Sequence, residues 1–333
     1  MSRYASAFAN PAGPGDARPI ALQIIKDEGA EGKLTGKVIV ITGISSGLGV
    51  ETARALSHTG AHLVLIARDI SKAKSALQDV LAPGTVADYV TMDNTSLSSV
   101  RSAAAQVLKV SRNQVNILIN NAGIMALPDL QLSEDGFEMQ LAVNHLAHFL
   151  LFELLKPAML DAATPVFSSR VVNLSSSAHR IASINETGNY NFENGDYHAW
   201  VAYGQSKTAS VYMTNEIERR YGNKGLHANA VHPGLIGTPL MKHVDAATLD
   251  GWAQNEAVGK VMKSVEQGAA TTVWAAVAKD WENKGGRYLA ECEVAPEGPD
   301  DHSAEGWGYV PHTYDAERET RLWNDSLKMV GLA

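Results

Sequence analysis

From Lys37 to the C-terminus, apolar runs of strand length alternate with longer segments in which apolar residues recur at helical spacing. Strands separated by helix-length segments pair in parallel, and the intervening helices cover both faces of the sheet. The pattern therefore predicts an α/β fold with one doubly wound, seven-stranded parallel sheet. The expected strands are residues 38–42, 62–67, 88–92, 117–120, 170–174, 227–231 and 287–291, and the expected helices are residues 48–59, 71–81, 136–155 and 203–221.

The domain organisation follows from the absence of repeats and linkers. With 333 residues, 45% of them hydrophobic and 19% charged, the chain has an ordinary globular composition. Residues 33–333 are expected to form a single domain, preceded by an N-terminal tail at residues 1–32. Within the tail, residues 5–19 are rich in Ala, Gly and Pro and are expected to be exposed. Residues 19–29 are expected to form a short helix that packs on the domain.

Three segments of the domain are expected to lie outside the sheet and its covering helices. Residues 178–200 are rich in Asn, Gly and His, whereas residues 241–263 are polar with a helical period. Both follow the C-terminal end of a strand, where ligands bind in open α/β sheets, so they are expected to be substrate loops. Residues 295–314 are expected to form a surface loop within a C-terminal extension, residues 295–333, which ends in a helix at residues 315–330.

Charge and composition argue against several classes of function. The formal net charge is −8 and no run of Lys and Arg is present, so nucleic-acid binding is not expected. The single cysteine, Cys292, cannot form an intramolecular disulfide. The longest apolar segment, residues 146–155, is about half of the roughly 20 residues that span a bilayer. No secretory signal is visible, so the protein is expected in the cytoplasm without a membrane span.

A glycine-rich turn connects the first expected strand to the first expected helix. Glycines let the backbone approach a ligand closely, and a helix N-terminus offers free N–H groups and the positive end of the helix dipole. The turn therefore predicts a site for the pyrophosphate of a dinucleotide, although a tight turn without a ligand is the alternative. The candidate cofactor residues in the turn are Gly43, Ser45, Ser46, Gly47, Leu48 and Gly49.

Further motifs follow the turn in a fixed order. They are Asn120-Asn121-Ala122-Gly123 at the end of the fourth expected strand, Asn144 on the next helix, Ser175-Ser176 after the fifth strand, Tyr203-(x)3-Lys207 at the start of a helix, and Pro233-Gly234 with Thr238. With Thr42-Gly43-(x)3-Gly47-x-Gly49, this order resembles the short-chain dehydrogenase/reductase family over about residues 33–275. In the C-terminal part, Arg321-Leu322-Trp323-Asn324 is similar to retinol-dehydrogenase-like and fungal carbonyl-reductase-like members.

This resemblance implies a Rossmann-like fold and hydride transfer between NADP(H) and an aldehyde, a ketone or the matching alcohol. It also implies a homodimer or homotetramer. The catalytic residues that it implies are Asn144, Ser176, Tyr203 and Lys207. The cofactor-binding residues that it implies, beyond the glycine-rich turn, are Arg68, Asp93, Asn94, Asn121, Ala122, Gly123, Tyr203, Lys207, Pro233, Gly234 and Thr238.

The chemistry of the tyrosine and lysine can also be argued from their spacing. Tyr203 and Lys207 are four residues apart, so they share one helix face. An ammonium beside a phenol favours the phenolate, and Lys207 is therefore expected to lower the Tyr203 pKa. Tyr203 would then act as acid in reduction and base in oxidation. By resemblance, Lys207 holds the nicotinamide ribose, Ser176 bonds the substrate oxygen, with Ser175 as the alternative, and Asn144 supports a water chain to the lysine.

The end of the second expected strand predicts a preference for NADP(H). In NAD sites an acidic residue about 20 positions after the glycine-rich turn binds the ribose 2′-hydroxyl. Ala67 occupies that position, and Arg68 follows with a guanidinium that can bind a 2′-phosphate. Ser45 or Ser46 can add a hydroxyl to the same phosphate. Asp69 has two interpretations, an acid at the ribose or a cap for the next helix.

Two functions of other classes are alternatives. Ser176 and His179 are close enough in sequence to suggest a hydrolase, but the GxSxG turn of such enzymes is absent. A catalytically silent, NADP-binding regulatory protein with the same fold is the second alternative. The presence of Ser176, Tyr203 and Lys207 together argues against it.

No metal site is expected, because His145 and His148 lack a third ligand in a recognisable spacing. The substrate is expected to be a fairly apolar small molecule. The expected wall residues are Met125, Trp200, Leu235 and Met241.

Overall fold

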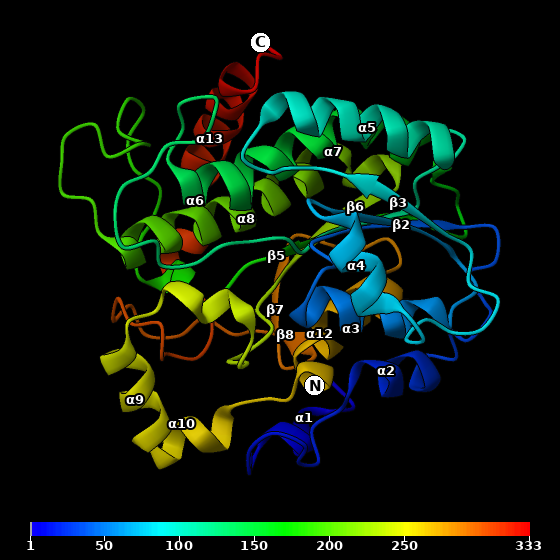
Figure 1. Cartoon of the computed structure of the whole chain (residues 1–333), viewed down its shortest axis with the longest axis horizontal. Helices are drawn as coiled ribbons and strands as arrows, with labels where there is room; N and C mark the ends of the chain where they lie inside the picture. The colour runs from blue at the N-terminus through cyan, green and yellow to red at the C-terminus, as the bar shows by residue number, and fades with distance from the viewer. Residues whose placement is uncertain (1) are drawn as a thin grey trace.

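The computed structural model describes residues 2–333 and places the strands of that range in one sheet, ordered β3-β2-β1-β4-β5-β6-β7-β8 (Figure 1). Strands β1 to β7 are parallel, and β8 pairs antiparallel with β7. The α/β class is confirmed, but the sheet has eight strands because two-residue β8 is too short for a sequence pattern. The strands are β1 (Val38–Thr42), β2 (His62–Ala67), β3 (Ala87–Thr91), β4 (Ile117–Asn120), β5 (Ser169–Leu174), β6 (Leu226–Val231), β7 (Arg287–Ala290) and β8 (Glu293–Val294).

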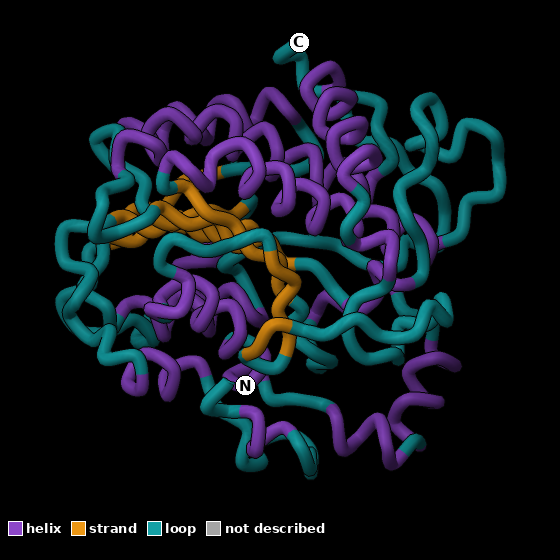
Figure 2. Tube along the Cα trace, turned by 180° about the vertical axis from the view of Figure 1, so that it is seen from behind, coloured by secondary structure: helices purple, strands orange, loops and turns teal. Residues whose placement is uncertain are grey.

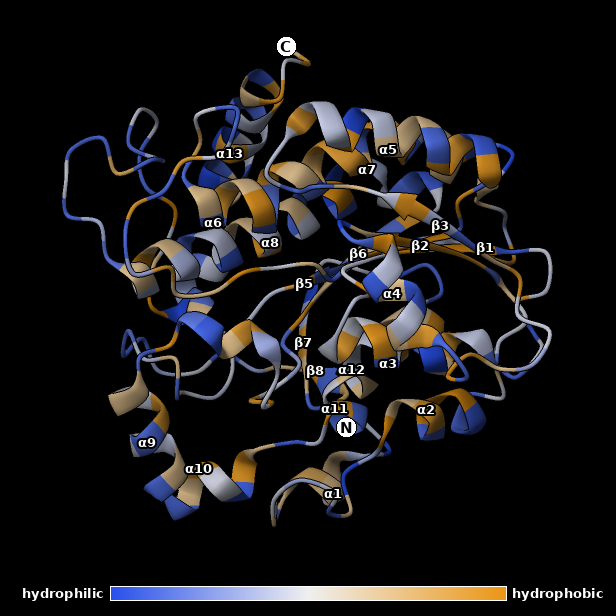
Figure 3. Cartoon of the chain, viewed as in Figure 1, coloured by the Kyte–Doolittle hydropathy of each residue, from blue (hydrophilic) through white to orange (hydrophobic). Residues whose placement is uncertain are grey.

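Helices cover both faces of this sheet, as Figure 2 shows from behind. Strand β1 is buried along its whole length because its side chains alternate between two cores. Val38 and Val40 pack in the core with α5 (Leu97–Val110), α7 (Ala147–Ala162) and α8 (Ala199–Tyr221). Ile39 and Ile41 pack in the core with α2 (Ala21–Asp27), α3 (Gly47–Ser57), α4 (Ile70–Leu77) and α12 (Ala270–Val277). Figure 3 shows the apolar strands between the two helix layers.

The remaining elements are short or lie at the periphery. The α-helices are α1 (Ala5–Phe8), α6 (Met139–Leu141), α9 (Ala246–Gln254), α10 (Glu256–Val261), α11 (Val265–Gly268) and α13 (Ala316–Met329). A π-helical turn, η1, spans Ala142–Leu146. The 3₁₀ turns are η2 (Ser177–Arg180), η3 (Gly222–Lys224), η4 (Pro239–His243), η5 (Lys279–Trp281) and η6 (Pro311–Thr313). No helix within residues 2–333 has the length and apolar character needed to cross a membrane.

Two helix boundaries differ from the expected ones near the site. The helix expected at residues 136–155 begins at Met139, is interrupted by η1 and ends at Ala162. The Glu138 carboxylate caps its start by accepting from the N–H groups of Gln140 and Leu141. Helix α8 begins at Ala199, four residues before the expected start, so Tyr203 lies in its second turn.

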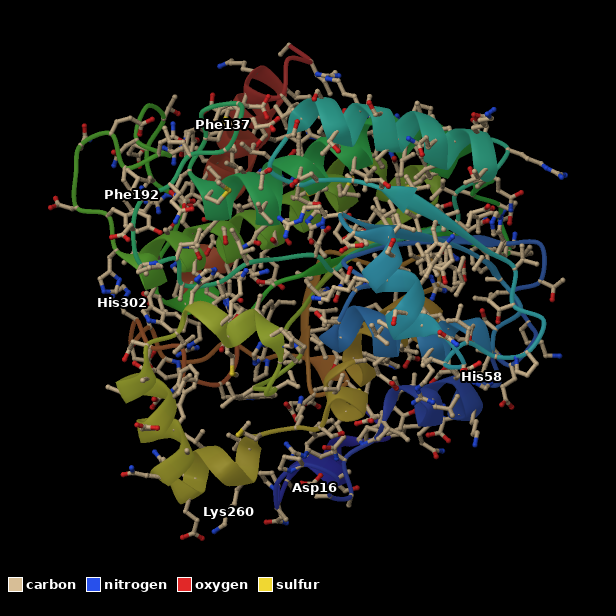
Figure 4. The ribbon with its side chains drawn as sticks, viewed as in Figure 1. Asp16, His58, Phe137, Phe192, Lys260 and His302 are labelled. Atoms are coloured by element: carbon tan, nitrogen blue, oxygen red, sulfur yellow. The ribbon has the colours of Figure 1, made fainter. Side chains whose placement is uncertain are left out.

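The N-terminal segment packs against the domain, so the expectation that residues 5–19 form an exposed tail is wrong in part: Gly13, Arg18 and Pro19 are buried, whereas Asn10 and Ala17 are among the residues that stay exposed. Arg18 is 4% exposed, and its guanidinium donates to the carbonyl oxygens of Gly13, Val261 and Met262. The Gly13 N–H also donates to the Lys260 carbonyl at 2.9 Å, and Figure 4 shows Asp16 beside Lys260. Composition did not reveal this packing because it depends on carbonyl groups about 240 residues away. Helix α2 packs on α12 and α3 as expected.

Candidate active site

One cavity of about 1650 Å³ opens at the carboxyl ends of β1, β4, β5 and β6. The sheet order reverses between β1 and β4, and ligands bind at such a switch point in doubly wound folds. Every residue predicted for cofactor binding or catalysis lines this cavity except Asn144. The tertiary structure therefore brings together residues that are up to about 195 positions apart in the sequence.

The glycine-rich turn brings the backbone of two strands into close contact. Gly43 has φ +76°, and a Cβ there would lie 2.7 Å from the Ala122 Cα. A Cβ on Gly49 would lie 2.2 Å from the Gly43 carbonyl oxygen. The Asn121 side chain donates to the carbonyl oxygens of Thr42, at 2.8 Å, and Gly43. The Ser46 side chain does not cap α3. The first N–H groups of α3 therefore have no side-chain acceptor at the N-cap, and the residues that carry them line the cavity.

The structure after β2 favours one of the two interpretations of Asp69, a helix cap rather than an acid at the ribose. Its carboxylate accepts from the Lys72 N–H at 2.9 Å and caps α4. Arg68 is exposed and lines the cavity, together with Lys72. Within residues 2–333, the Arg68 side chain has no hydrogen-bond or ion-pair partner. A guanidinium is therefore available at this end of the cavity, while the neighbouring acid is occupied by the helix cap.

The turn after β3 forms another part of the wall. The Asp93 carboxylate accepts from both the N–H and the hydroxyl of Thr95, at 2.9 and 2.8 Å. The Asn94 amide donates to the Val143 carbonyl at 3.1 Å. The Asn94 bond attaches the turn to η1, and the Asp93 side chain is held within the turn itself.

Sequence reasoning missed a buried pair that supports the turn after β4. The Thr42 hydroxyl oxygen accepts from the N–H groups of Asn121 and Ala122, each at 3.0 Å. His148 Nε2 lies 3.0 Å from the same oxygen, and His148 Nδ1 lies 3.1 Å from the Asn144 carbonyl oxygen. Burial lowers the His148 pKa to about 4, so the ring is neutral near neutral pH. With its proton on Nδ1 donated to Asn144, Nε2 accepts from the Thr42 hydroxyl.

Tyr203 and Lys207 lie side by side on α8 at the inner end of the cavity, 3% and 4% exposed. The Lys207 ammonium donates to the Leu174 carbonyl at 3.0 Å and lies 5.5 Å from the centre of the Tyr203 ring. Burial raises the Tyr203 pKa to about 12, and the Ser176 hydroxyl opposes this rise. Burial lowers the Lys207 pKa to about 8. The expectation that Lys207 lowers the Tyr203 pKa is therefore wrong for the protein alone, because desolvation of the phenol dominates.

The two serines after β5 have different partners. The Ser175 hydroxyl donates to the Lys207 carbonyl at 2.9 Å. Ser176 Oγ accepts from the Ala178 N–H at 3.1 Å, and the Ser176 hydroxyl acts on Tyr203 in the direction that lowers the pKa of the phenol. The geometry thus favours Ser176 over Ser175 as the serine beside the phenol. Ser177, the residue after Ser176, donates its backbone N–H to His232 Nδ1 at 3.1 Å.

Asn144 lies on the π-helical turn with its side chain fully bonded. Its Oδ1 accepts from the Ile124 N–H at 2.9 Å, and its Nδ2 donates to the Ile124 carbonyl and to Ser206 Oγ. Ser206 in turn donates to the Tyr203 carbonyl at 2.8 Å. Asn144 is therefore linked to the backbone that carries Tyr203 but does not line the cavity. A Cβ on Gly123 would lie 3.1 Å from Asn144 Oδ1, so the glycine allows this close approach.

The Pro233-Gly234 turn depends on a lysine that sequence reasoning did not identify. The Lys263 ammonium donates to the Pro233 carbonyl at 3.1 Å and forms a 2.6 Å ion pair with Glu291. Gly234 has φ +103°, and a Cβ there would lie 2.8 Å from Lys263 Nζ. Lys263 lies in an irregular segment without a motif, so no sequence pattern indicates that it stabilises the Pro233-Gly234 turn. Thr238 directly precedes η4 and lies next to Gly47.

An apolar cluster surrounds Tyr203 on the substrate side of the cavity. Trp200 packs edge-on against both Tyr203 and Trp252, with ring centroids 6.2 and 6.3 Å apart. All four expected wall residues, Met125, Trp200, Leu235 and Met241, line the cavity. Two further segments, residues 5–11 and 302–307, contribute wall residues that were not expected.

His145 of η1 and His148 of α7, the two histidines considered as metal ligands, form hydrogen bonds within the protein. His145 Nε2 lies 2.8 Å from the Ser326 hydroxyl, and burial lowers the His145 pKa to about 3. Within the part of the chain that the structure describes, no group of three or more His, Cys, Asp or Glu residues is arranged to hold a metal ion.

Comparisons with known proteins agree with this geometry. The sequence profile of the short chain dehydrogenase family matches residues 37–248. A short-chain dehydrogenase/reductase, Prx1 from Penicillium roqueforti, is 48% identical over 99% of this chain and 96% of its own length. Human retinol dehydrogenase 13 is 35% identical over 90% of this chain and 86% of its own length.

A solved structure extends the similarity to the fold. The crystal structure of an uncharacterised protein from Mycobacterium paratuberculosis has a TM-score of 0.68 and 30% identity, covering 91% of this chain and 97% of that one. The profile spans more than half of the chain, and the fungal relative is similar along nearly all of it. The chain therefore belongs to the short-chain dehydrogenase/reductase family of oxidoreductases.

Proposed function

We propose that this protein is an NADP(H)-dependent oxidoreductase that reduces an aldehyde or ketone, or oxidises the matching alcohol. The observation that carries the proposal is the shared cavity. Its inner end holds Ser176, Tyr203 and Lys207, and its other parts include the glycine-rich turn and Arg68. A dinucleotide fits these features: three positions of the turn are glycines, whose backbone can lie close to a pyrophosphate, and α3 presents an N-terminus without a side-chain cap.

The cofactor, when bound, supplies or accepts the hydride. Ser176 would donate a hydrogen bond to the substrate oxygen and hold it beside Tyr203. In reduction, the Tyr203 hydroxyl gives its proton to that oxygen as the hydride reaches the carbonyl carbon, and the phenolate then regains a proton from solvent. In oxidation, the phenolate takes the alcohol proton. Lys207 would bond the ribose hydroxyls, because it lines the cavity and its ammonium, a hydrogen-bond donor, lies 5.5 Å from the centre of the Tyr203 ring.

The raised pKa of Tyr203 bears on this mechanism. Burial favours the neutral phenol, which is the form that donates a proton in reduction. A positive charge in the cavity would favour the phenolate that oxidation requires, and an oxidised nicotinamide would supply such a charge. We therefore propose that Tyr203 is neutral when the cofactor is reduced and more readily deprotonated when the cofactor is oxidised.

Arg68 supports NADP(H) over NAD(H). Among the described residues its guanidinium has no competing partner, and Lys72 and Ser46 also line the cavity. These groups supply donors for a 2′-phosphate, whereas the neighbouring Asp69 is bonded to the α4 backbone. The apolar cluster around Trp200 and Trp252 supports an apolar carbonyl compound as substrate. The name of the human relative, a retinol dehydrogenase, is consistent with an apolar alcohol or aldehyde.

The test is consumption of NADPH with a panel of aldehydes, ketones and quinones, measured at the absorbance of the reduced nicotinamide. Binding of NADPH is measured in parallel by the rise in melting temperature. The wild type is expected to turn over at least one apolar carbonyl, whereas Tyr203→Phe is expected to bind NADPH without turnover. Binding by the wild type without turnover of any panel member would instead support a regulatory protein.

A further inference from the structure

Arg180, at the end of η2, has a guanidinium that bonds to a single loop of the C-terminal extension, residues 298–308. Nε donates to the Ser303 carbonyl at 2.9 Å. Nη1 donates to the carbonyl oxygens of Trp307 and Gly308, at 3.1 and 3.3 Å. Nη2 donates at 2.7 Å to the Pro299 carbonyl and to the Asp301 carboxylate. The five N–H donors of an arginine are thus matched by acceptors of this one loop.

The loop is shaped to receive this side chain. The Arg180 side chain is fully buried, and Asp301 is its ion-pair partner. A Cβ on Gly306 would lie 2.1 Å from Arg180 Nη2, and a Cβ on Gly298 would lie 2.9 Å from Nη1. Because neither position has room for a side chain beside the guanidinium, glycine at both positions permits the contact. Without Arg180, four loop carbonyl groups would each lose a hydrogen bond from its guanidinium, which disfavours this loop conformation.

Both ends of this contact lie at the active site. The 3₁₀ turn that ends with Arg180 begins directly after Ser176, which lines the cavity together with Tyr203. The loop contributes residues 302–307 to the cavity wall, and Figure 4 shows His302 just above α9 at the edge of the molecule. Trp307 lines the cavity while 45% exposed, so its ring is available to an apolar ligand.

We propose that Arg180 is a positioning residue that holds loop 298–308 as one wall of the substrate site. Through Trp307 this wall contacts the part of an apolar substrate that lies away from the reacting carbonyl. The loop thereby favours long or bulky carbonyl compounds over small ones. This inference rests on the proposed function for its substrate part, whereas the positioning of the loop by Arg180 is independent of turnover.

Arg170 provides a matched control. It is also a buried arginine, and it donates to the carbonyl oxygens of Ala276 and Ala278 and to the Glu282 carboxylate. It does not line the cavity. Replacement of either arginine by lysine removes a forked set of donors from a buried site, so a general loss of stability is common to both variants. A change in substrate selectivity is expected for Arg180→Lys alone.

The first measurement is amide hydrogen exchange of the wild type, Arg180→Lys and Arg170→Lys. We expect exchange within residues 298–308 to be faster by about tenfold or more in Arg180→Lys than in the other two proteins, since loss of this contact lowers the local opening free energy. The second measurement is kcat and KM with NADPH for propanal and decanal. In Arg180→Lys, the KM for decanal is expected to rise about tenfold relative to that for propanal, an effect of about 1.4 kcal/mol, with the KM for NADPH unchanged.

Trp307→Ala tests the substrate contact without altering the Arg180 bonds, which are made to the Trp307 backbone. It is expected to raise the KM for decanal relative to propanal and to leave exchange of the loop as in the wild type. Unchanged exchange in Arg180→Lys, or an unchanged KM ratio in Trp307→Ala, would overturn the inference. If Arg180→Lys does not fold, Trp307→Ala alone decides the substrate part. If the wild type turns over no carbonyl compound, the proposed function and the substrate part fail together, while the exchange result still decides whether Arg180 holds the loop.

Discussion

Replacement of Lys207 by methionine is expected to stabilise the protein while abolishing its activity. Within residues 2–333 the buried Lys207 ammonium has no acidic partner, and burial lowers its pKa from 10.5 to about 8. At about 1.4 kcal/mol for each pH unit, the folded protein is destabilised by about 3 kcal/mol when this lysine is charged. Loss of the hydrogen bond to the Leu174 carbonyl costs about 1 kcal/mol. A net gain of about 2 kcal/mol is expected near pH 7, which corresponds to a rise in Tm of roughly 4 °C.

The effect has a defined pH dependence. Below about pH 8 Lys207 is charged in both the folded and the unfolded protein, so the full destabilisation is present. Between about pH 8 and pH 10.5 the unfolded state binds more protons than the folded state, and the wild type gains stability as the pH rises. The advantage of Lys207→Met should therefore shrink over this interval and disappear above it.

Thermal and urea unfolding of the protein without added nucleotide measure this effect at several pH values. The control is Lys33→Met, because Lys33 is exposed and its replacement is expected to change stability by less than about 0.5 kcal/mol at any pH. A Lys207→Met variant that is less stable than the wild type near pH 7, or whose advantage does not change with pH, would refute the assignment of Lys207 as an uncompensated buried cation. Activity and the affinity for NADPH should both fall in this variant.

The other predictions concern the cofactor, the proton donor and metals. Tyr203→Phe should lower kcat by about 100-fold or more with little change in the Kd for NADPH, because only the proton-transferring hydroxyl is removed; a tenth of the wild-type kcat or more would contradict this role. Arg68→Ala should lower kcat/KM for NADPH about tenfold to 100-fold and leave that for NADH nearly unchanged, since Arg68 has no partner in the described part of the chain to lose; an unaltered preference for NADPH would show that Arg68 does not bind the phosphate. Gly43→Ala should weaken nucleotide binding and lower Tm, because its Cβ would lie 2.7 Å from the Ala122 Cα; wild-type values for both would exclude the close approach. EDTA should leave turnover unchanged, and loss of activity restored by zinc would overturn this expectation.

Local sequence patterns determined the fold class and most of the candidate site. Alternation of strand and helix periods predicted the parallel sheet, because these periods follow from which face each element buries. The glycine-rich turn predicted a site for the pyrophosphate of a dinucleotide, and the turn lines the cavity. The spacing of Tyr203 and Lys207 predicted that they share a helix face, and both line the cavity. Each of these features depends on residues that are near one another in the chain.

Only the tertiary structure decided the features that depend on distant partners. The packing of residues 5–19 requires the carbonyl groups of residues 260–262, which accept from Arg18. The contact of Arg180 with loop 298–308 joins two segments more than 115 positions apart. The direction of the Tyr203 pKa shift was also beyond the sequence, because spacing to Lys207 gives proximity but not the degree of desolvation. Burial is a property of the whole packed molecule, and it outweighs a neighbouring charge that donates its hydrogen bond to the backbone.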